Sequence, residues 1–192
     1  MNPLEAVYAA LKSLAPITPE DLAPLDGQYR SETFRARTLL FREGERYEKV
    51  TFIQKGLVKK YYLTNEGKEF IKEFTWEGQI TTPYASLLQN IPATYSMETL
   101  EDTEILSINY ATIRDLIETK PNWTKLGKAL ADFHFLNREI REMELLKNSA
   151  AERYEIFKRR FPHLLGRLKK QDIASYLGIT PVSLSRLESQ GR

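Results

Sequence analysis

The sequence has no cysteine and only two histidines, His134 and His163. Without cysteine, the chain can form no disulfide, thiolate zinc site, iron–sulfur cluster or cysteine nucleophile. Two histidines so far apart do not make a metal cluster, so we expect neither a metal nor a cofactor. No apolar run is long enough to span a membrane, and residues 1–12 lack the basic-then-apolar pattern of a signal peptide. We therefore expect a cytoplasmic protein without a membrane partner.

Charge is unevenly distributed along the chain. The 192 residues carry a formal net charge of +2. Residues 149–192 contain nine Lys or Arg against four Asp or Glu, a net of +5, which leaves −3 for residues 1–148. The positive segment includes two basic runs, Lys158–Arg160 and Lys169–Lys170. Such a segment favours a partner that carries phosphates, although a charge run can also be a solvated face.

The stretch Lys169–Arg186 has the pattern of two short helices joined by a tight turn. Ile173, Ala174 and Leu177 fall on one face of the first helix. Gly178 follows them, where a helix that ends sharply needs a residue tolerant of positive φ. A side chain larger than that of Ala174 would wedge the two helices apart.

The second helix of this stretch is predicted to begin at Thr180 and Pro181. Thr180 is a suitable N-cap, and proline fits the first helical position because no backbone N–H is needed there. Leu184 and Leu187 then form an apolar stripe that faces the first helix. Two short helices joined by a turn that contains glycine are typical of a helix-turn-helix unit. The alternative is an ordinary helical hairpin inside a core.

The outer face of the second helix suits the DNA major groove. Val182 and Ser183 are small enough for close approach, and Arg186 can contact a guanine or a phosphate. The start of this helix can face a phosphate, and the entrance to the first helix can anchor others. The predicted DNA-binding residues are Lys169, Lys170, Gln171, Thr180, Pro181, Val182, Ser183 and Arg186.

Residues 31–109 have the texture of short β-strands. Apolar stretches rich in Phe, Tyr, Ile, Val and Thr alternate with turn residues. Turn signals at residues 65–67 and 76–78 predict hairpins. This pattern predicts an antiparallel barrel or jelly roll, preceded by two short N-terminal helices. The clearest predicted strands are Val50–Gln54, Val58–Thr64, Lys68–Thr75, Ala93–Thr99 and Glu104–Ile108.

A jelly roll can also be an enzyme with a metal site inside it. Residues 31–109 contain no histidine, so a histidine-rich metal site cannot form there. No acid pair or nucleophile–base constellation stands out elsewhere. We therefore expect that the protein recognises a partner and is not an enzyme.

A long helix is predicted from Pro121 to about Asn148, because apolar residues step by three or four throughout. It is longer than one small barrel needs for its own cover. We interpret it as a coiled-coil-like dimer seam, and the alternative is a helix buried along its own barrel. The predicted interface residues are Leu126, Leu130, Phe133 and Ile140.

The order of these segments resembles the Crp/Fnr family of transcription regulators. The resemblance runs from about Leu39 to Arg186. Its most specific motifs are Glu43-Gly44-Glu45, Phe52-Ile53-Gln54-Lys55-Gly56, Asn65-Glu66-Gly67 and Ile173-Ala174-Ser175-Tyr176-Leu177-Gly178-Ile179-Thr180. It implies an α+β chain in which residues 1–120 form N-terminal helices and a cyclic-nucleotide-binding-like jelly-roll barrel. Residues 121–148 would be the dimerisation helix, and residues 149–192 the helix-turn-helix domain.

Two departures from the family pattern change what the resemblance implies. Family members that bind cyclic nucleotides carry a Gly-Glu pair and then an Arg-Ser or Arg-Thr pair, where this chain has Thr82-Pro83 and Ala93-Thr94. Without the carboxylate and the guanidinium, a buried cyclic phosphate would lose its solvation uncompensated. The family also usually adds a β-hairpin wing after the helix-turn-helix, and we expect this wing to be missing here.

The resemblance implies a homodimer that binds a near-palindromic operator in double-stranded DNA, with RNA polymerase as a further partner. Regulation by cyclic AMP is not expected. Another small-molecule effector could occupy a pocket lined by Thr82, Tyr84, Thr94 and Tyr95, although polar barrel walls are also ordinary structure. The alternative function is a sensor or protein-interaction module that binds a different small ligand and no DNA.

Overall fold

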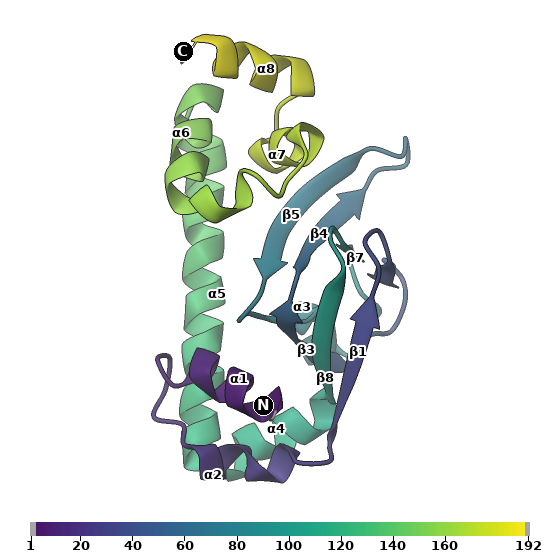
Figure 1. Cartoon of the computed structure of the whole chain (residues 1–192), viewed down its shortest axis with the longest axis vertical. Helices are drawn as coiled ribbons and strands as arrows, with labels where there is room; N and C mark the ends of the chain where they lie inside the picture. Colours follow the sequence, from purple (N-terminus) through teal and green to yellow (C-terminus); the bar gives the residue numbers. More distant parts are fainter. Residues whose placement is uncertain (1–2, 191–192) are drawn as a thin grey trace.

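A long helix joins two differently built ends of the molecule in a computed structural model that describes residues 3–190. Helix α5 (Pro121–Lys147) runs along most of the molecule, with a β-sandwich at its side (Figure 1). The N-terminal helices lie at one end, and three C-terminal helices lie at the other. The helices and 3₁₀ turns of the N-terminal end are α1 (Pro3–Leu11), α2 (Pro19–Leu22) and η1 (Ala23–Leu25).

The sandwich consists of two antiparallel four-stranded sheets in a jelly-roll arrangement, as predicted. One sheet has the order β1-β8-β3-β6, and its strands are β1 (Tyr29–Phe34), β8 (Thr103–Asn109), β3 (Lys49–Lys55) and β6 (Ile80–Thr81). The other has the order β2-β7-β4-β5, and its strands are β2 (Leu39–Phe41), β7 (Ser96–Thr99), β4 (Leu57–Leu63) and β5 (Glu69–Trp76). Strand β5 is therefore an edge strand of its sheet.

The core between the sheets is mainly apolar. Ile53, Val58 and Met97 are each 0% exposed and pack together there. Burial of such side chains stabilises the fold by roughly 1.5–3 kcal/mol each. Gly56 joins β3 to β4 with a φ of 102°, and a Cβ atom at this position would lie 2.5 Å from Oγ1 of Thr103. Only glycine fits this crossing of the chain.

The turn at Asn65–Gly67 connects β4 and β5 as predicted, with Leu63 opposite Glu69. The predicted strand Ala93–Thr99 is shorter in the structure, because β7 begins only at Ser96. Its first residue instead pairs with a neighbouring turn, through the amide of Gly44 and the carbonyl of Ala93 at 2.7 Å.

Helix α5 begins against the N-terminal end and helix α4 (Tyr110–Thr119). Nε1 of Trp123 donates a hydrogen bond to the carbonyl of Asp21 at 2.8 Å. Leu126 is only 1% exposed in the same cluster, and Leu130 packs against it. The prediction that Leu126 lies in the dimer seam is therefore wrong, because its own subunit already buries this side chain.

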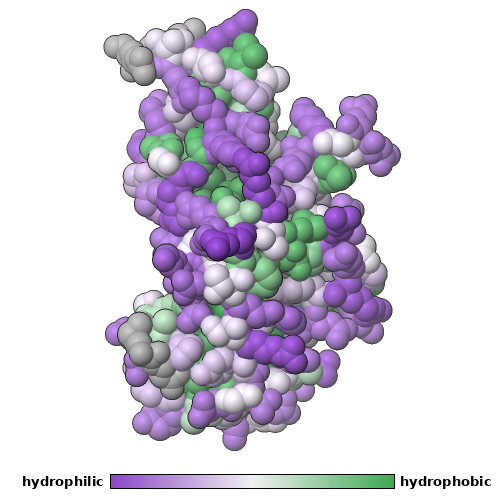
Figure 2. All heavy atoms as spheres, turned by 45° about the vertical axis from the view of Figure 1, so that its right-hand side comes forward, coloured by the Kyte–Doolittle hydropathy of each residue, from purple (hydrophilic) through white to green (hydrophobic). Residues whose placement is uncertain are grey.

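The second half of α5 leaves that cluster and keeps much of its apolar surface exposed. Phe133, Leu136, Ile140 and Met143 are spaced by three, four and three residues and are 47%, 58%, 39% and 47% exposed. Exposed apolar groups concentrated along one helix in this way mark surfaces that a partner covers. Figure 2 brings the sandwich side of the molecule forward: hydrophilic side chains cover most of that face, and hydrophobic ones gather near mid-height.

The C-terminal end begins at α6 (Ala150–Arg160) after a capping box formed by Ser149 and Glu152. A short 3₁₀ turn, η2 (Pro162–Leu164), precedes α7 (Lys170–Leu177) and α8 (Pro181–Gln190). The ring of Phe157 in α6 packs on the ring of Tyr176 in α7, and their centroids lie 5.4 Å apart. Helix α8 is the last element of the described residues, and the missing wing stays a prediction.

Candidate nucleic-acid interface and cleft

Helices α7 and α8 form the predicted helix-turn-helix. Gly178 ends α7 with a φ of 68°, and the amide of Ile179 donates to the carbonyl of Ala174 at 3.0 Å. This left-handed C-cap turns the chain sharply towards α8. Ala174 and Leu184 are both 0% exposed, so the two helices meet closely at the small residue.

The start of α8 is organised around Thr180. Its Oγ1 accepts a hydrogen bond from the amide of Ser183 at 3.1 Å, which caps the helix as predicted. The two hydroxyl groups also lie 2.9 Å apart. Ser183 is half-buried and its hydroxyl already has a partner, so it is less available to bases than the sequence suggested.

Two predicted base-reading residues project freely from α8. Val182 is 61% exposed, and Arg186, one helical turn further on, is also exposed. Thr180 and Pro181 at the start of the helix are exposed too. Figure 1 places α8 at the extreme end of the molecule, away from the N-terminal helices. No described part of the chain covers this face.

The predicted phosphate contacts fall into two groups at the start of α7. Lys169 and Gln171 are exposed, and Lys169 has no ion-pair partner within 4 Å among residues 3–190. Lys170 instead forms an ion pair with Glu188 of α8. This pairing is invisible to motif analysis because the two residues are far apart in the sequence.

Helix α7 is also fixed to the β-sandwich. Oγ of Ser175 donates to the carbonyl of Glu69 at 2.8 Å and accepts from the amide of Ile71 at 3.0 Å. One serine therefore satisfies two backbone groups on the open side of the edge strand β5. Phe74 and Tyr176 extend the contact, with ring centroids 5.4 Å apart.

A second link joins the same two parts of the molecule. The guanidinium of Arg167 lies 2.9 Å from a carboxylate oxygen of Glu77 and 2.8 Å from one of Glu101. Hydrogen bonds to both carboxylates raise the pKa of Arg167 above its usual range. The helix-turn-helix thus has a defined position against the sandwich, which sequence reasoning did not anticipate.

A cleft of about 1350 Å³ separates the sandwich from α5. Thr82, Tyr84, Thr94 and Tyr95 all line it, so the four residues of the predicted pocket come together. The hydroxyl of Tyr95 donates to the carbonyl of Thr82 at 3.0 Å, and Oγ1 of Thr82 donates to the carbonyl of Lys49 at 2.9 Å. Tyr84 lies on helix α3 (Tyr84–Gln89), which the sequence analysis missed.

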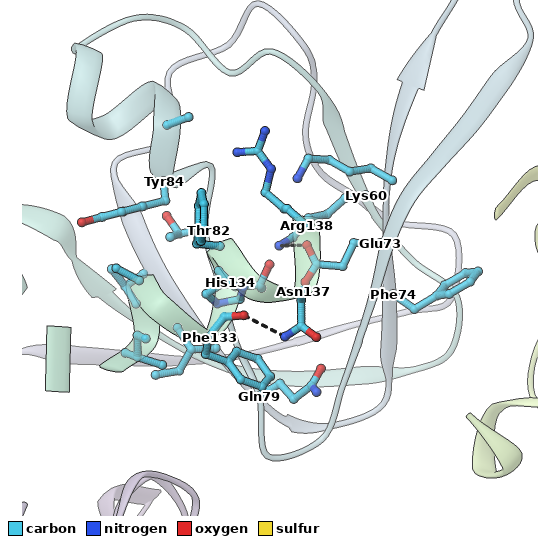
Figure 3. A pocket seen from close by; sticks show the side chains of 18 of the residues that line it. Lys60, Glu73, Phe74, Gln79, Thr82, Tyr84, Phe133, His134, Asn137 and Arg138 are labelled. Atoms are coloured by element: carbon cyan, nitrogen blue, oxygen red, sulfur yellow. Dashed lines mark hydrogen bonds and ion pairs between the residues drawn. The ribbon is translucent and has the colours of Figure 1, made fainter. Parts of the chain in front are cut away.

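Charged side chains lie in the cleft beside these residues. Figure 3 shows Lys60, Glu73 and Arg138 in the cleft, with Lys60 pointing towards Glu73. Nζ of Lys60 donates to Oε2 of Glu73 at 3.1 Å, and the Lys60 side chain is only 4% exposed. Burial alone would raise the pKa of Glu73, but Lys60 and Lys72 hold it below its usual value.

Two further basic groups complete this cluster. Nζ of Lys72 lies over the ring of Tyr95, 5.1 Å from its centroid. Burial lowers the pKa of Lys72, and the charges of Lys60 and Arg138 lower it further. Burial also lowers the pKa of His134, which favours its neutral form. The only signal in the sequence was charge in the interior of the predicted strands, at Lys60 and at Lys72-Glu73.

Other kinds of site find no support in the described chain. No helix among residues 3–190 is long and apolar enough to cross a membrane. Within the same residues, no group of three or more histidine or acidic side chains could hold a metal ion.

Known proteins share this arrangement of a sandwich, a long helix and a helix-turn-helix. Residues 31–120 match the family model of the cyclic nucleotide-binding domain. The chain is 25% identical to the fumarate and nitrate reduction regulatory protein of Yersinia pestis, over 82% of this chain and 67% of that protein. It is 27% identical to the transcriptional activator protein anr of Pseudomonas aeruginosa, over 91% of this chain and 78% of that protein.

Solved structures show the same fold. FixK2 from Bradyrhizobium japonicum superposes with a TM-score of 0.74 at 22% identity, over 84% of this chain and 83% of that chain. The c-di-GMP-responsive regulator CLP from Xanthomonas campestris superposes with a TM-score of 0.71 at 14% identity, over 90% of this chain and 91% of that chain. Fold and relatives together define a transcription regulator built on a cyclic-nucleotide-binding domain. The chain shares the fold of Crp/Fnr-type transcription regulators, and its curated relatives are regulators of this type.

Proposed function

We propose that this protein is a cytoplasmic, homodimeric regulator that binds a near-palindromic DNA operator through α8 and is not controlled by cyclic AMP. The observation that carries the proposal is the exposed outer face of α8, with Val182 and Arg186 at the end of the molecule. Its function is recognition, and no catalytic step is assigned to it. RNA polymerase is the further partner of such a regulator.

Base recognition rests on Val182 and Arg186. Arg186 can donate two hydrogen bonds to one guanine, and Val182 can pack on a thymine methyl group. Ser183 supports the helix start, because its amide and hydroxyl both contact Thr180. Lys169 and Gln171 contact phosphates, which sets the position of α8 along the groove. Lys170 is a weaker contributor, because it must leave Glu188 to reach a phosphate.

Dimerisation uses the second half of α5. The exposed residues Phe133, Leu136, Ile140 and Met143 have the alternating spacing of a coiled-coil seam, which two helices bury together. Leu130 borders this seam, and Leu126 belongs to the subunit core. A symmetric dimer carries two copies of α8, so the two half-sites lie about 34 Å apart, one turn of DNA.

Selection of DNA from a random pool by the purified protein tests this function. We expect enrichment of an inverted repeat, and a mobility shift with the enriched duplex but not with a shuffled one. The Arg186→Ala variant is the matched control, since it removes the principal base contact and leaves the fold in place. If no motif is enriched, or if the shuffled duplex binds equally well, the protein is a sensor that acts without DNA.

A further inference from the structure

Helix α7 ends in two carbonyl groups that the helix itself does not satisfy. The turn at Gly178 bonds to carbonyls further back, so those of Tyr176 and Leu177 have no intrahelical partner. The negative end of a helix dipole attracts cations, but α7 has no basic residue in its last turn. The hydrogen-bond donors and the positive charge must therefore come from other elements.

Two arginines from other helices bond to these carbonyls. A guanidinium nitrogen of Arg141, on α5, donates to the carbonyl of Tyr176, and the guanidinium carbon lies 3.6 Å from the centroid of the Tyr176 ring. Nε of Arg153, on α6, donates to the carbonyl of Leu177 at 3.0 Å, and its Nη1 donates to the carbonyl of Asn148 at 2.6 Å. The planar guanidinium of Arg141 thus both bonds and stacks, which restricts its geometry more than one hydrogen bond would.

An ion pair joins α6 to the same part of α5. Arg160 pairs with Glu144, whose side chain is only 8% exposed, and Nη1 of Arg160 lies 3.3 Å from Oε2 of Glu144. A carboxylate held by two guanidinium nitrogens fixes the relative position of its two helices. Figure 1 shows α6 and α7 beside the C-terminal part of α5. These three helices are therefore bonded to one another near the end of α5.

The second half of α5 has little other attachment to its own subunit. Its buried residues are Trp123 and Leu126 at the start and then Glu144 near the end, and the cleft lies along its sandwich side. Helix α7, by contrast, is held on β5 by Ser175. Arg141 is therefore not needed to keep α7 on the sandwich. Its contact instead fixes α7 relative to α5.

This angle matters in a dimer whose two subunits meet along α5. The direction of α8 relative to α5 then sets the separation and the relative rotation of the two recognition helices. One base pair added between two half-sites moves one of them by about 3.4 Å and turns it by about 35° around the DNA axis. A rigid dimer accepts the wrong spacing only by twisting or bending the DNA, whereas a flexible dimer can adjust itself.

We propose that Arg141 is a positioning residue that fixes the angle between α5 and the helix-turn-helix, and thereby selects operators by the spacing of their half-sites. Arg141 touches no base and acts through Tyr176. Arg153 and the pair of Glu144 with Arg160 support the same geometry from α6. The inference rests on the proposed dimer that binds an inverted repeat, so one of its two tests is made without DNA.

The first test measures the position of α8 directly. Because the chain contains no cysteine, Lys125→Cys on α5 and Ser185→Cys on α8 create two unique, exposed labelling positions. Double electron–electron resonance of spin-labelled protein, diluted with excess unlabelled protein, gives their distance within one subunit. We expect one narrow distance distribution, which Arg141→Met broadens. Arg138→Met removes the same charge from an exposed position of the same helix and should leave the distribution narrow.

The second test uses the selected operator and duplexes with one base pair added or removed between its half-sites. The unmodified protein should prefer the selected spacing by about tenfold or more, as the cost of deforming DNA requires. Arg141→Met should reduce this preference to less than about threefold, because a mobile α8 no longer deforms the DNA. Arg138→Met should keep the preference, and Arg141→Lys should retain most of it, since lysine can still donate to the Tyr176 carbonyl. A misfolded helix-turn-helix would instead lose affinity for all duplexes alike.

The proposal is overturned if Arg141→Met leaves the distance distribution unchanged, or if it leaves the spacing preference unchanged. It is equally overturned if Arg138→Met alters both as strongly as Arg141→Met does. Failure of the proposed function has a different signature. If Arg141→Met broadens the distribution but the unmodified protein selects no operator, DNA binding and the spacing role are both excluded, while Arg141 still positions α8.

Discussion

Arg186 is the only Lys or Arg on α8 within the described residues, and its side chain is exposed. Replacing it with alanine should cost about 1–3 kcal/mol of binding free energy on the selected operator and relax the preference at one base position per half-site. Fluorescence anisotropy with operator and shuffled duplexes measures both effects. An equal loss on the two duplexes would show that Arg186 contacts a phosphate and not a base.

The two lysines at the start of α7 provide the control. Lys169→Ala should weaken the binding of operator and shuffled DNA alike, since one phosphate contact is lost. The slope of the logarithm of the binding constant against the logarithm of the salt concentration should become shallower by about one unit per subunit. Lys170→Ala should have the smaller effect, because Lys170 already pairs with Glu188. Equal effects of the two substitutions would mean that DNA breaks this pair at no cost.

Cyclic nucleotides should not bind in the cleft. Thr82-Pro83 and Ala93-Thr94 supply neither a carboxylate for the ribose nor a guanidinium for the phosphate. The hydroxyl of Thr82 already donates a hydrogen bond to the carbonyl of Lys49. Calorimetry with cyclic AMP and cyclic GMP at tens of micromolar should therefore detect no heat of binding. A micromolar dissociation constant for either would contradict this placement of the pocket residues.

Local rules explain which residues the sequence could identify. Gly178 and Thr180 are defined by backbone requirements within a few residues, so their roles were predictable. The pair of Lys170 with Glu188 and the cluster around Lys72 depend on segments that only the tertiary fold brings together. A charged residue inside a predicted strand was the only sign of that cluster.

Among the elements, α5 makes the most direct prediction. Ile140→Asp places a charge in the proposed seam, where burial of an unpaired carboxylate strongly opposes association. We expect the variant to be monomeric by light scattering at micromolar concentration, where the unmodified protein is dimeric. Leu14→Asp is the matched control, because Leu14 is 38% exposed and Ile140 is 39% exposed. A monomeric unmodified protein, or a dimeric Ile140→Asp variant, would exclude this seam.

In the same helix, the periodicity of apolar residues predicts the secondary structure but not the packing partners. Apolar spacing and Pro121 predicted the helix almost to its last residue. Spacing does not show which neighbour covers each apolar residue. Leu126 was therefore predicted in the dimer interface, although the N-terminal helices of its own subunit bury it. Strand β1 escaped notice for a related reason, because it lies at a sheet edge and alternates only weakly between exposed and half-buried residues.

At the scale of the whole molecule, strand β5 connects the cleft to the DNA-binding unit. Its Lys72 faces the cleft, and Glu69 and Ile71 hold Ser175 of α7 through two hydrogen bonds of 2.8 and 3.0 Å. Because α7 is fixed to this strand, we expect a change in the position of β5 to reach α8.

Ser175→Ala tests this contact, because it removes both hydrogen bonds to β5 while Arg167 still holds the unit near Glu77 and Glu101. We expect the free energy of unfolding to fall by about 1–3 kcal/mol, since two backbone groups of β5 lose their partner. Ser13→Ala, an exposed serine near α1, is the matched control and should leave the stability unchanged. Denaturant unfolding of the two variants beside the unmodified protein measures both effects. Equal stability of Ser175→Ala and Ser13→Ala would show that the contact between α7 and β5 does not stabilise the protein.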